Sequence, residues 1–395
     1  MKILVLTLAI SFIFSGWQAS AEPYPLISPA VQDRIDDYNI KLRKPGYNIN
    51  SKYANSRVPI GDFLAGDYDI DASDLFPLEK SIQDINNRGY DTEIIKGVVE
   101  SLIADIQQDV DVLARLLGYH EYVAPSASLV SSNQIAGWPV TKYVLSGRYG
   151  QFLEAYCAFE DDREGLLVLL PGRGADVRAM WNLGLPLDYM NHAAWVYHQR
   201  TSMNVCALTI YNLPDVPLYR YGLTGRGVGI TIIKDFITWA IPQQSADFAG
   251  PIIIGGTSNG GHMAEFAAIL DDRIDGVISS GAAARYNYPL SHFADISLAP
   301  TALAKADGAY IGVNMLRSAS IYRLVHPKAL LVSVGTHDAG LTFSGYPDKF
   351  DQLHEAKQTY GDRSNCLAIN LFLGQHAMDP RGDAPLLNQL LENCL

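Results

Sequence analysis

Residues 256–260 read Gly-Thr-Ser-Asn-Gly and hold Ser258 between two glycines. The apolar segment 251–254 precedes them, and residues 262–268 have the composition of a helix start. A serine on a sharp turn from strand to helix exposes its hydroxyl, and the flanking glycines make room for the strained backbone. The amides at the start of that helix favour negative charge that develops beside them. Ser258 is therefore the candidate nucleophile; a glycine-rich turn without a chemical role is the alternative.

A serine hydroxyl becomes an effective nucleophile only when a base removes its proton. The apolar segment 330–334 leads into Asp338, and the segment 367–373 leads into His376. The carboxyl ends of parallel strands gather at one edge of a sheet, where active sites form. We expect His376 to take the proton of Ser258, and Asp338 to hold the imidazole and stabilise its charged form.

Both assignments have alternatives. His337 could act as the base, but it shares a loop with Asp338 and precedes it in the chain, whereas the expected order is serine, acid, histidine. His354 lies within a predicted helix. An aspartate after a strand is also a common turn or helix cap, and a single histidine is often structural.

Acyl transfer also requires donors for the negatively charged oxygen of the tetrahedral intermediate. The backbone amide of Asn259 directly follows the nucleophile and is one candidate. The second donor is expected from the loop after the strand 166–170, where Arg173 and Gly174 are both candidates. Tyr219 and Tyr221 are candidate substrate contacts, with surface aromatics as the alternative. Neither a metal site nor a cofactor is expected.

Short apolar segments alternate with helices from about residue 140 onward, which predicts a mostly parallel sheet within an α/β fold. The run 166–170 is apolar throughout, as in strands covered on both faces. Between the predicted strands 205–211 and 251–254, a helix is predicted over residues 228–240. The predicted strands are 142–145, 152–159, 165–170, 205–211, 251–254, 276–280, 329–334 and 367–373.

The chain divides into a signal peptide at 1–21, an N-terminal, partly helical extension at 22–139 and a catalytic domain at 140–395. Within the extension, apolar residues at helical spacing predict a helix between residues 91 and 118. Within the catalytic domain, about 45 residues separate two strands, more than a crossover helix needs. We expect a mainly helical insertion at about 282–327.

Lys2, the apolar run 3–14 and Ala19-Ser20-Ala21 form the pattern of a cleaved signal peptide, so we expect a secreted or periplasmic protein. An uncleaved anchor is the alternative, but the run is shorter than the roughly 20 residues of a spanning helix. No stable membrane insertion is expected. The net charge of −12 argues against nucleic-acid binding, which needs a basic surface.

The run Gly-Thr-Ser-Asn-Gly-Gly-His-Met at 256–263 resembles the elbow of α/β-hydrolase serine esterases. Feruloyl esterases, acetylxylan esterases and polyhydroxyalkanoate depolymerases have similar elbows, as do prolyl-oligopeptidase-type peptidases. Residues 335–338 and 374–376 match the acid and histidine loops of these groups, and the resemblance covers roughly 140–395. It implies an eight-stranded mostly parallel sheet with helices on both faces, in which only the second strand is antiparallel.

Four cysteines allow three disulfide connectivities in an exported protein, and simple buried thiols are the alternative. The topology that the resemblance implies makes the strands of Cys157 and Cys206 neighbours. It also places Cys366 and Cys394 where they would tie the last strand to the C-terminal helix. These two pairings are therefore the expected ones.

We predict an exported serine hydrolase that cleaves a small-molecule or polymer-borne carboxylic ester through an acyl-enzyme on Ser258. A peptidase or amidase with the same triad is one alternative. A catalytically silent hydrolase fold that serves for binding is another, since a fold by itself does not determine function. The residues do not determine the acyl or alcohol part of the substrate, nor the oligomeric state.

Overall fold

The computed structural model describes residues 103–116, 128–146, 152–172, 175–185, 190–209, 225–244, 248–282, 321–335, 353, 356–372 and 376–395. The predicted signal peptide, most of the N-terminal extension and most of the insertion at 282–327 lie outside them. No helix within the described ranges is long and apolar enough to cross a membrane.

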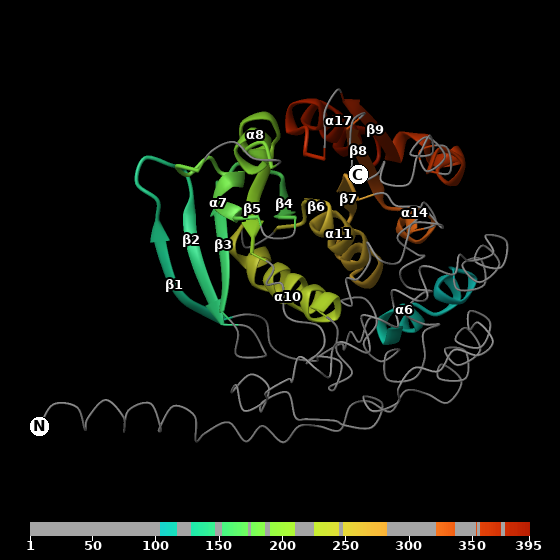
Figure 1. The fold of residues 1–395 in the computed structure, drawn as a ribbon, viewed down its shortest axis with the longest axis horizontal. Helices are drawn as coiled ribbons and strands as arrows, with labels where there is room; N and C mark the ends of the chain where they lie inside the picture. Colours follow the sequence, from blue (N-terminus) through green and yellow to red (C-terminus); the bar gives the residue numbers. More distant parts are fainter. Residues whose placement is uncertain are drawn as a thin grey trace, which may run out of the picture.

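A nine-stranded sheet in the order β1-β2-β3-β5-β4-β6-β7-β8-β9 forms the centre of the molecule (Figure 1). All neighbours from β5 to β9 are parallel, whereas β1 with β2, β2 with β3, and β3 with β5 are antiparallel. The strands are β1 (Ser128–Gln134), β2 (Thr141–Ser146), β3 (Phe152–Ala158), β4 (Gly165–Leu170), β5 (Met203–Leu208), β6 (Ile252–Thr257), β7 (Gly276–Ser280), β8 (Ala329–Gly335) and β9 (Leu367–Phe372).

Strands β2 to β9 correspond to the predicted eight strands, with β3 as the antiparallel second strand. The expected count was wrong by one, because β1 adds a further antiparallel strand at the edge. All seven residues of β1 are exposed and only Leu129 and Val130 are large and apolar, so the segment lacks the buried apolar pattern of the others. β1 lies before residue 140; the predicted domain division itself stays a prediction.

Helices cover both faces of the sheet (Figure 1). α7 (Val177–Met180), α8 (Ala193–Arg200) and α17 (Pro380–Asn393) share one apolar cluster with one face. The other face packs against α6 (Asp111–Leu116), α10 (Gly225–Ala240), α11 (Asn259–Leu270) and α14 (Ile321–Val325). Two short 3-10 helices, η2 (Ile241–Gln243) and η5 (Gly361–Cys366), lie after α10 and before β9.

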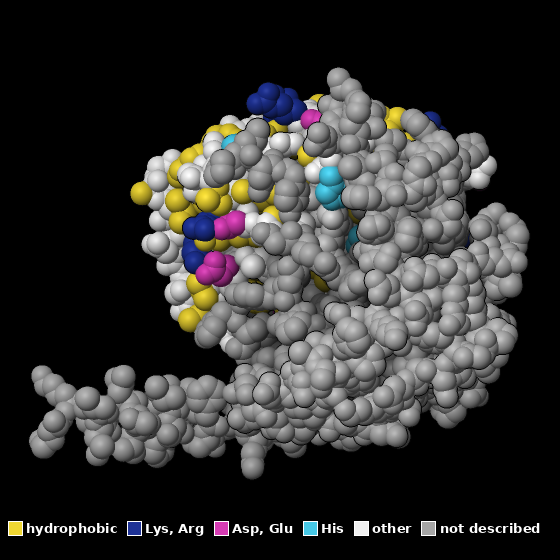
Figure 2. Space-filling model, in the orientation of Figure 1, with side chains coloured by type: hydrophobic (Ala, Val, Ile, Leu, Met, Phe, Trp, Pro, Cys, Tyr) yellow, Lys and Arg dark blue, Asp and Glu magenta, His cyan; other side chains and the backbone are white. Residues whose placement is uncertain are grey.

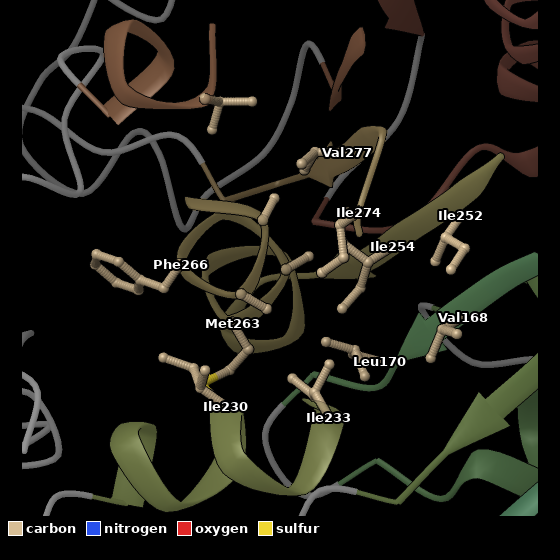
Figure 3. Packing of buried hydrophobic residues seen from close by; sticks show 14 of the residues in the cluster. Val168, Leu170, Ile230, Ile233, Ile252, Ile254, Met263, Phe266, Ile274 and Val277 are labelled. Carbon is tan, nitrogen blue, oxygen red and sulfur yellow. The ribbon is translucent and has the colours of Figure 1, made fainter. Parts of the chain in front are cut away.

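Alternation along the strands divides the core into these two layers. On β4, Leu166, Val168 and Leu170 face the α10–α11 layer, whereas Leu167 and Leu169 face the α8–α17 layer. All six residues of β4 are buried, as expected of a central parallel strand. Figure 3 shows side chains of α10, α11, β4 and β6 meeting in the first layer.

Several elements differ from their predicted extents by one to three residues; β5, for example, begins at Met203, two residues before the predicted start. Two of the differences have a clear structural cause. β6 continues through two glycines to Thr257, because only a glycine fits between its neighbours: a Cβ on Gly255 would lie 2.8 Å from the Cβ of Ile278. The helix predicted between residues 91 and 118 is interrupted after residue 108. There the Asp109 side chain accepts the amide N–H of Asp111 (3.1 Å) and starts α6 as a separate helix.

Both expected disulfides are confirmed. Cys157 of β3 and Cys206 of β5 lie directly opposite each other, with Cα atoms 4.1 Å apart, and both are buried. Cys366 and Cys394, with Cα atoms 4.9 Å apart, join the start of β9 to the end of α17.

The Cys157–Cys206 disulfide closes a loop with a sequence separation of 49 in the middle of the core. The double variant Cys157→Ala/Cys206→Ala should lower the free energy of unfolding by about 2–5 kcal/mol, because the unfolded chain gains freedom. Urea unfolding of the oxidised proteins measures the change. Cys366→Ala/Cys394→Ala is the comparison, and its shorter loop, with a separation of 28, predicts a smaller loss. Equal stability of the first variant and the wild type would contradict the prediction.

Candidate active site

Ser258 occupies the turn between β6 and α11 with φ 54° and ψ −118°. A positive φ is uncommon for a residue with a side chain and is held only where the surroundings enforce it. Ser258 is only partly buried, between a fully buried strand and the helix N-terminus. The backbone therefore has the strained strand-to-helix turn expected of a serine nucleophile.

The glycines around Ser258 are required by close backbone contacts. A Cβ on Gly256 would lie 2.5 Å from the carbonyl carbon of Gly260. A Cβ on Gly260 would overlap the carbonyl oxygen of Leu170 and lie 2.6 Å from that of Pro171. The start of α11 thus rests directly on the end of β4, where the loop predicted to supply an oxyanion donor begins.

Asn259 is the first residue of α11. Amides in the first turn of a helix have no acceptor within the helix, so the Asn259 N–H is available to an oxygen placed beside Ser258. Pro171 and Gly172 lie buried at the end of β4, and Arg173 and Gly174 fall outside the described residues. The choice between those two amides stays open.

His376 lies between β9 and α17, beyond the carboxyl end of its strand. The segment that it begins, residues 376–379, is joined to the nucleophile turn through Ser280. The Ser258 amide donates to the Ser280 carbonyl oxygen (2.9 Å), and the Ser280 hydroxyl donates to the carbonyl oxygen of Ala377 (3.3 Å). The structure therefore brings the segment of His376 and the turn of Ser258 to the same edge of the sheet.

Several predicted residues lie outside the described part of the chain: Asp338, Tyr219 and Tyr221, together with the alternative bases His337 and His354. Their roles stay predictions. Among the described residues, no group of three histidine, cysteine, aspartate or glutamate side chains is arranged to hold a metal ion.

Sequence reasoning missed a buried carboxyl group in α17, the helix that follows the segment of His376. Asp383, in the first turn of α17, accepts hydrogen bonds from the Asn370 amide (2.7 Å) and the Tyr197 hydroxyl (3.2 Å). Burial outweighs these hydrogen bonds and raises the pKa of Asp383 to about 7. A polar residue one turn into a helix usually faces solvent, so the local sequence carries no signal for this burial.

A second buried carboxylate lies on the opposite face, in the helix that follows Ser258. Glu265 accepts a hydrogen bond from the Ser279 hydroxyl (2.5 Å) and lies 3.2 Å from Nδ1 of His262. These polar partners offset the cost of burying the carboxylate. They also tie α11 to β7, the strand that ends in Ser280.

Charged side chains form pairs on the side of the sheet near β2 and β3 (Figure 2). Lys142 and Glu154 lie 2.6 Å apart across these two strands, and Arg178 and Asp176 lie 2.5 Å apart beside them. Exposed pairs of this kind contribute little to stability, but they keep this part of the described surface close to neutral.

The close contact at Gly260 predicts a strong effect of one added methyl group. Gly260→Ala should lower the free energy of unfolding by roughly 1–3 kcal/mol, because the backbone of Leu170 and Pro171 cannot move aside. Gly361→Ala is the matched control: its Cβ would meet no atom within 4 Å, so its stability should stay near that of the wild type. Urea unfolding compares the two, and equal losses would contradict the geometry.

Asp383 should make stability dependent on pH. Between about pH 4 and pH 7 the unfolded chain has lost the Asp383 proton while the folded protein keeps it, so this group's contribution to stability falls as pH rises. Asp383→Asn cannot ionise. Its stability relative to the wild type should therefore rise from pH 4 to pH 8, by at most about 4 kcal/mol.

Urea unfolding of both proteins across that pH range measures the difference. Asp362→Asn, which alters an exposed carboxylate of η5, is the control and should shift far less. A difference between Asp383→Asn and the wild type that stays constant with pH would show that the buried carboxyl does not titrate in this range.

No protein-family model and no curated protein matches the chain. Solved structures do match it in fold. A glucuronoyl esterase from Solibacter usitatus has a TM-score of 0.50 at 12% identity, over 74% of this chain and 91% of its own. A CE15 glucuronoyl esterase from Teredinibacter turnerae T7901 has a TM-score of 0.52 at 14% identity, over 73% of this chain and 85% of its own.

Identities this low relate the proteins by fold alone. The chain has the α/β-hydrolase fold, and its structural neighbours are esterases, in agreement with the resemblance of its elbow.

Proposed function

We propose that the protein is an exported serine hydrolase that cleaves carboxylic esters through an acyl-enzyme on Ser258. The observation that carries this proposal is the backbone of Ser258, at φ 54° between a buried strand and the N-terminus of α11. A strained turn of this kind costs stability and persists where it presents a reactive side chain.

In the proposed reaction, His376 removes the hydroxyl proton of Ser258 as its oxygen attacks the ester carbonyl. The Asn259 amide and an amide of Arg173 or Gly174 stabilise the resulting oxyanion. The tetrahedral intermediate then collapses, the alcohol leaves with the proton from His376, and the acyl group remains on Ser258. Water then attacks the acyl carbon as His376 takes its proton, the bond to Ser258 breaks, and His376 returns the proton to the serine oxygen as the acid leaves. Asp338 orients the imidazole throughout.

Two further observations support this proposal. Two solved structures that match the chain in fold are glucuronoyl esterases, which favours an ester over an amide substrate. The two disulfides are typical of an oxidising compartment, which supports export to the periplasm or beyond.

A fluorophosphonate probe tests the nucleophile. The purified wild type should become labelled, and Ser258→Ala should not, because the probe reacts with the activated serine oxygen. His376→Ala should slow labelling by at least about 1,000-fold, and Asp338→Asn should also slow it strongly, because both residues activate the serine. Circular dichroism spectra and melting temperatures check that each variant is folded.

Ester and amide panels then separate the possible substrates. The ester panel includes uronate esters, because two proteins of the same fold are glucuronoyl esterases. Faster turnover of amides would favour a peptidase or amidase. Absence of labelling in the folded wild type would overturn the proposed nucleophile and favour a binding role.

A further inference from the structure

Ser280 is a fully buried residue at the carboxyl end of β7. β7 lies beside β6, and Ser280 pairs with Thr257, the residue that directly precedes the proposed nucleophile. On its other side Ser280 pairs with Ser333 of β8. It therefore lies on an interior strand, at the end of the strands where the proposed catalytic residues meet.

Ser280 uses two different groups to hold two different parts of the proposed site. Its carbonyl oxygen accepts the amide N–H of Ser258 (2.9 Å) and the hydroxyl of Thr257 (3.4 Å). Its own hydroxyl donates to the carbonyl oxygen of Ala377 (3.3 Å), the residue next to His376. One residue thus joins the nucleophile turn to the histidine segment.

The rest of the histidine segment is held from other elements. Asn191, in the turn before α8, donates its side-chain amide to the carbonyl oxygen of Met378. Asn191 has a φ of 48°, a conformation that asparagine tolerates better than most residues. Asn370 of β9 donates to the Asp379 carboxylate (3.1 Å). Residues 377, 378 and 379 each accept a hydrogen bond from a different element.

These contacts matter more for the reaction than for folding. A single hydrogen bond adds modestly to stability, because water replaces it in the unfolded chain. Proton transfer between Ser258 and His376 is far more sensitive, since a displacement of about 1 Å can slow an enzyme roughly 100-fold.

We propose that Ser280 and Asn191 are positioning residues that set the placement of His376 relative to Ser258. The inference rests on the proposed function, because it assumes that these two side chains exchange a proton. Neither residue touches the substrate. Their loss should therefore reduce kcat and leave KM nearly unchanged.

The test measures hydrolysis of p-nitrophenyl acetate by the full-length, disulfide-bonded protein. Ser280→Ala and Asn191→Gly should each lower kcat by about 10–100-fold with KM changed less than about 2-fold. Glycine at position 191 keeps the positive φ and removes only the side chain. Ser280→Thr retains the hydroxyl and should recover most of the lost kcat.

Asn388→Ala is the matched control. Asn388 also donates its side-chain amide to a distant backbone carbonyl, that of Arg200 (3.0 Å), but it lies in α17 away from the histidine segment. Its kcat should stay within about 2-fold of the wild type, since its hydrogen bond joins α17 to the end of α8 and not to residues 376–379. If Asn388→Ala loses as much kcat as Asn191→Gly, the loss reflects a general loosening around α17, and the proposal is overturned.

A double variant separates positioning from general damage. Because Ser280 acts through His376, adding Ser280→Ala to His376→Ala should lower the residual kcat by less than about 2-fold. A further 10-fold loss in that background would contradict the inference. If Ser280→Ala does not fold, Asn191→Gly, alone and combined with His376→Ala, provides the same test.

The failure of the inference is distinguishable from that of the proposed function. If Ser258→Ala retains turnover, the proposed nucleophile is wrong. If Ser258→Ala is inactive while Ser280→Ala and Asn191→Gly keep the wild-type kcat, the nucleophile stands and the positioning role is overturned.

Discussion

The close approach between the start of α11 and the end of β4 is the constraint on which the proposed site depends. Gly260 lies so near the carbonyl oxygens of Leu170 and Pro171 that no side chain fits between them. The chain turns sharply between β6 and this contact, and Ser258 lies at the turn with a positive φ of 54°. The contact also places the N-terminus of α11 against the end of β4, where the loop predicted to supply the second oxyanion donor begins.

The sheet connects the turn of Ser258 to the other parts of the proposed site. Its parallel strands end at one edge, and Ser280 at the end of β7 links the turn after β6 to the segment after β9. Buried carboxyl groups lie on both faces of the sheet, Glu265 in α11 and Asp383 in α17. Buried polar groups and a densely packed apolar sheet therefore meet at this edge.

Elements buried on both faces were predictable, because continuous apolar runs between turn residues leave few other interpretations. β4 and β7 have the predicted bounds, and β8 extends one residue further. β1 was missed because its exposed, serine-rich sequence has no apolar face, and only its pairing with β2 makes it a strand. The break after residue 108 was missed because the apolar periodicity continues across it, whereas the cap at Asp109 depends on one side-chain hydrogen bond.

The amino-acid sequence by itself determined the strand-turn-helix around Ser258, the succession of strands and helices, and the candidates for base and acid, because these follow from local pattern and chain order. The disulfide pairs became predictable once the fold was assumed. Only the tertiary structure decided that Ser280 meets Ala377, that Asn191 holds Met378 and that Asp383 is buried. Hydrogen bonds between residues about 100 or more positions apart depend on how layers pack together, and they leave no periodic pattern in the chain.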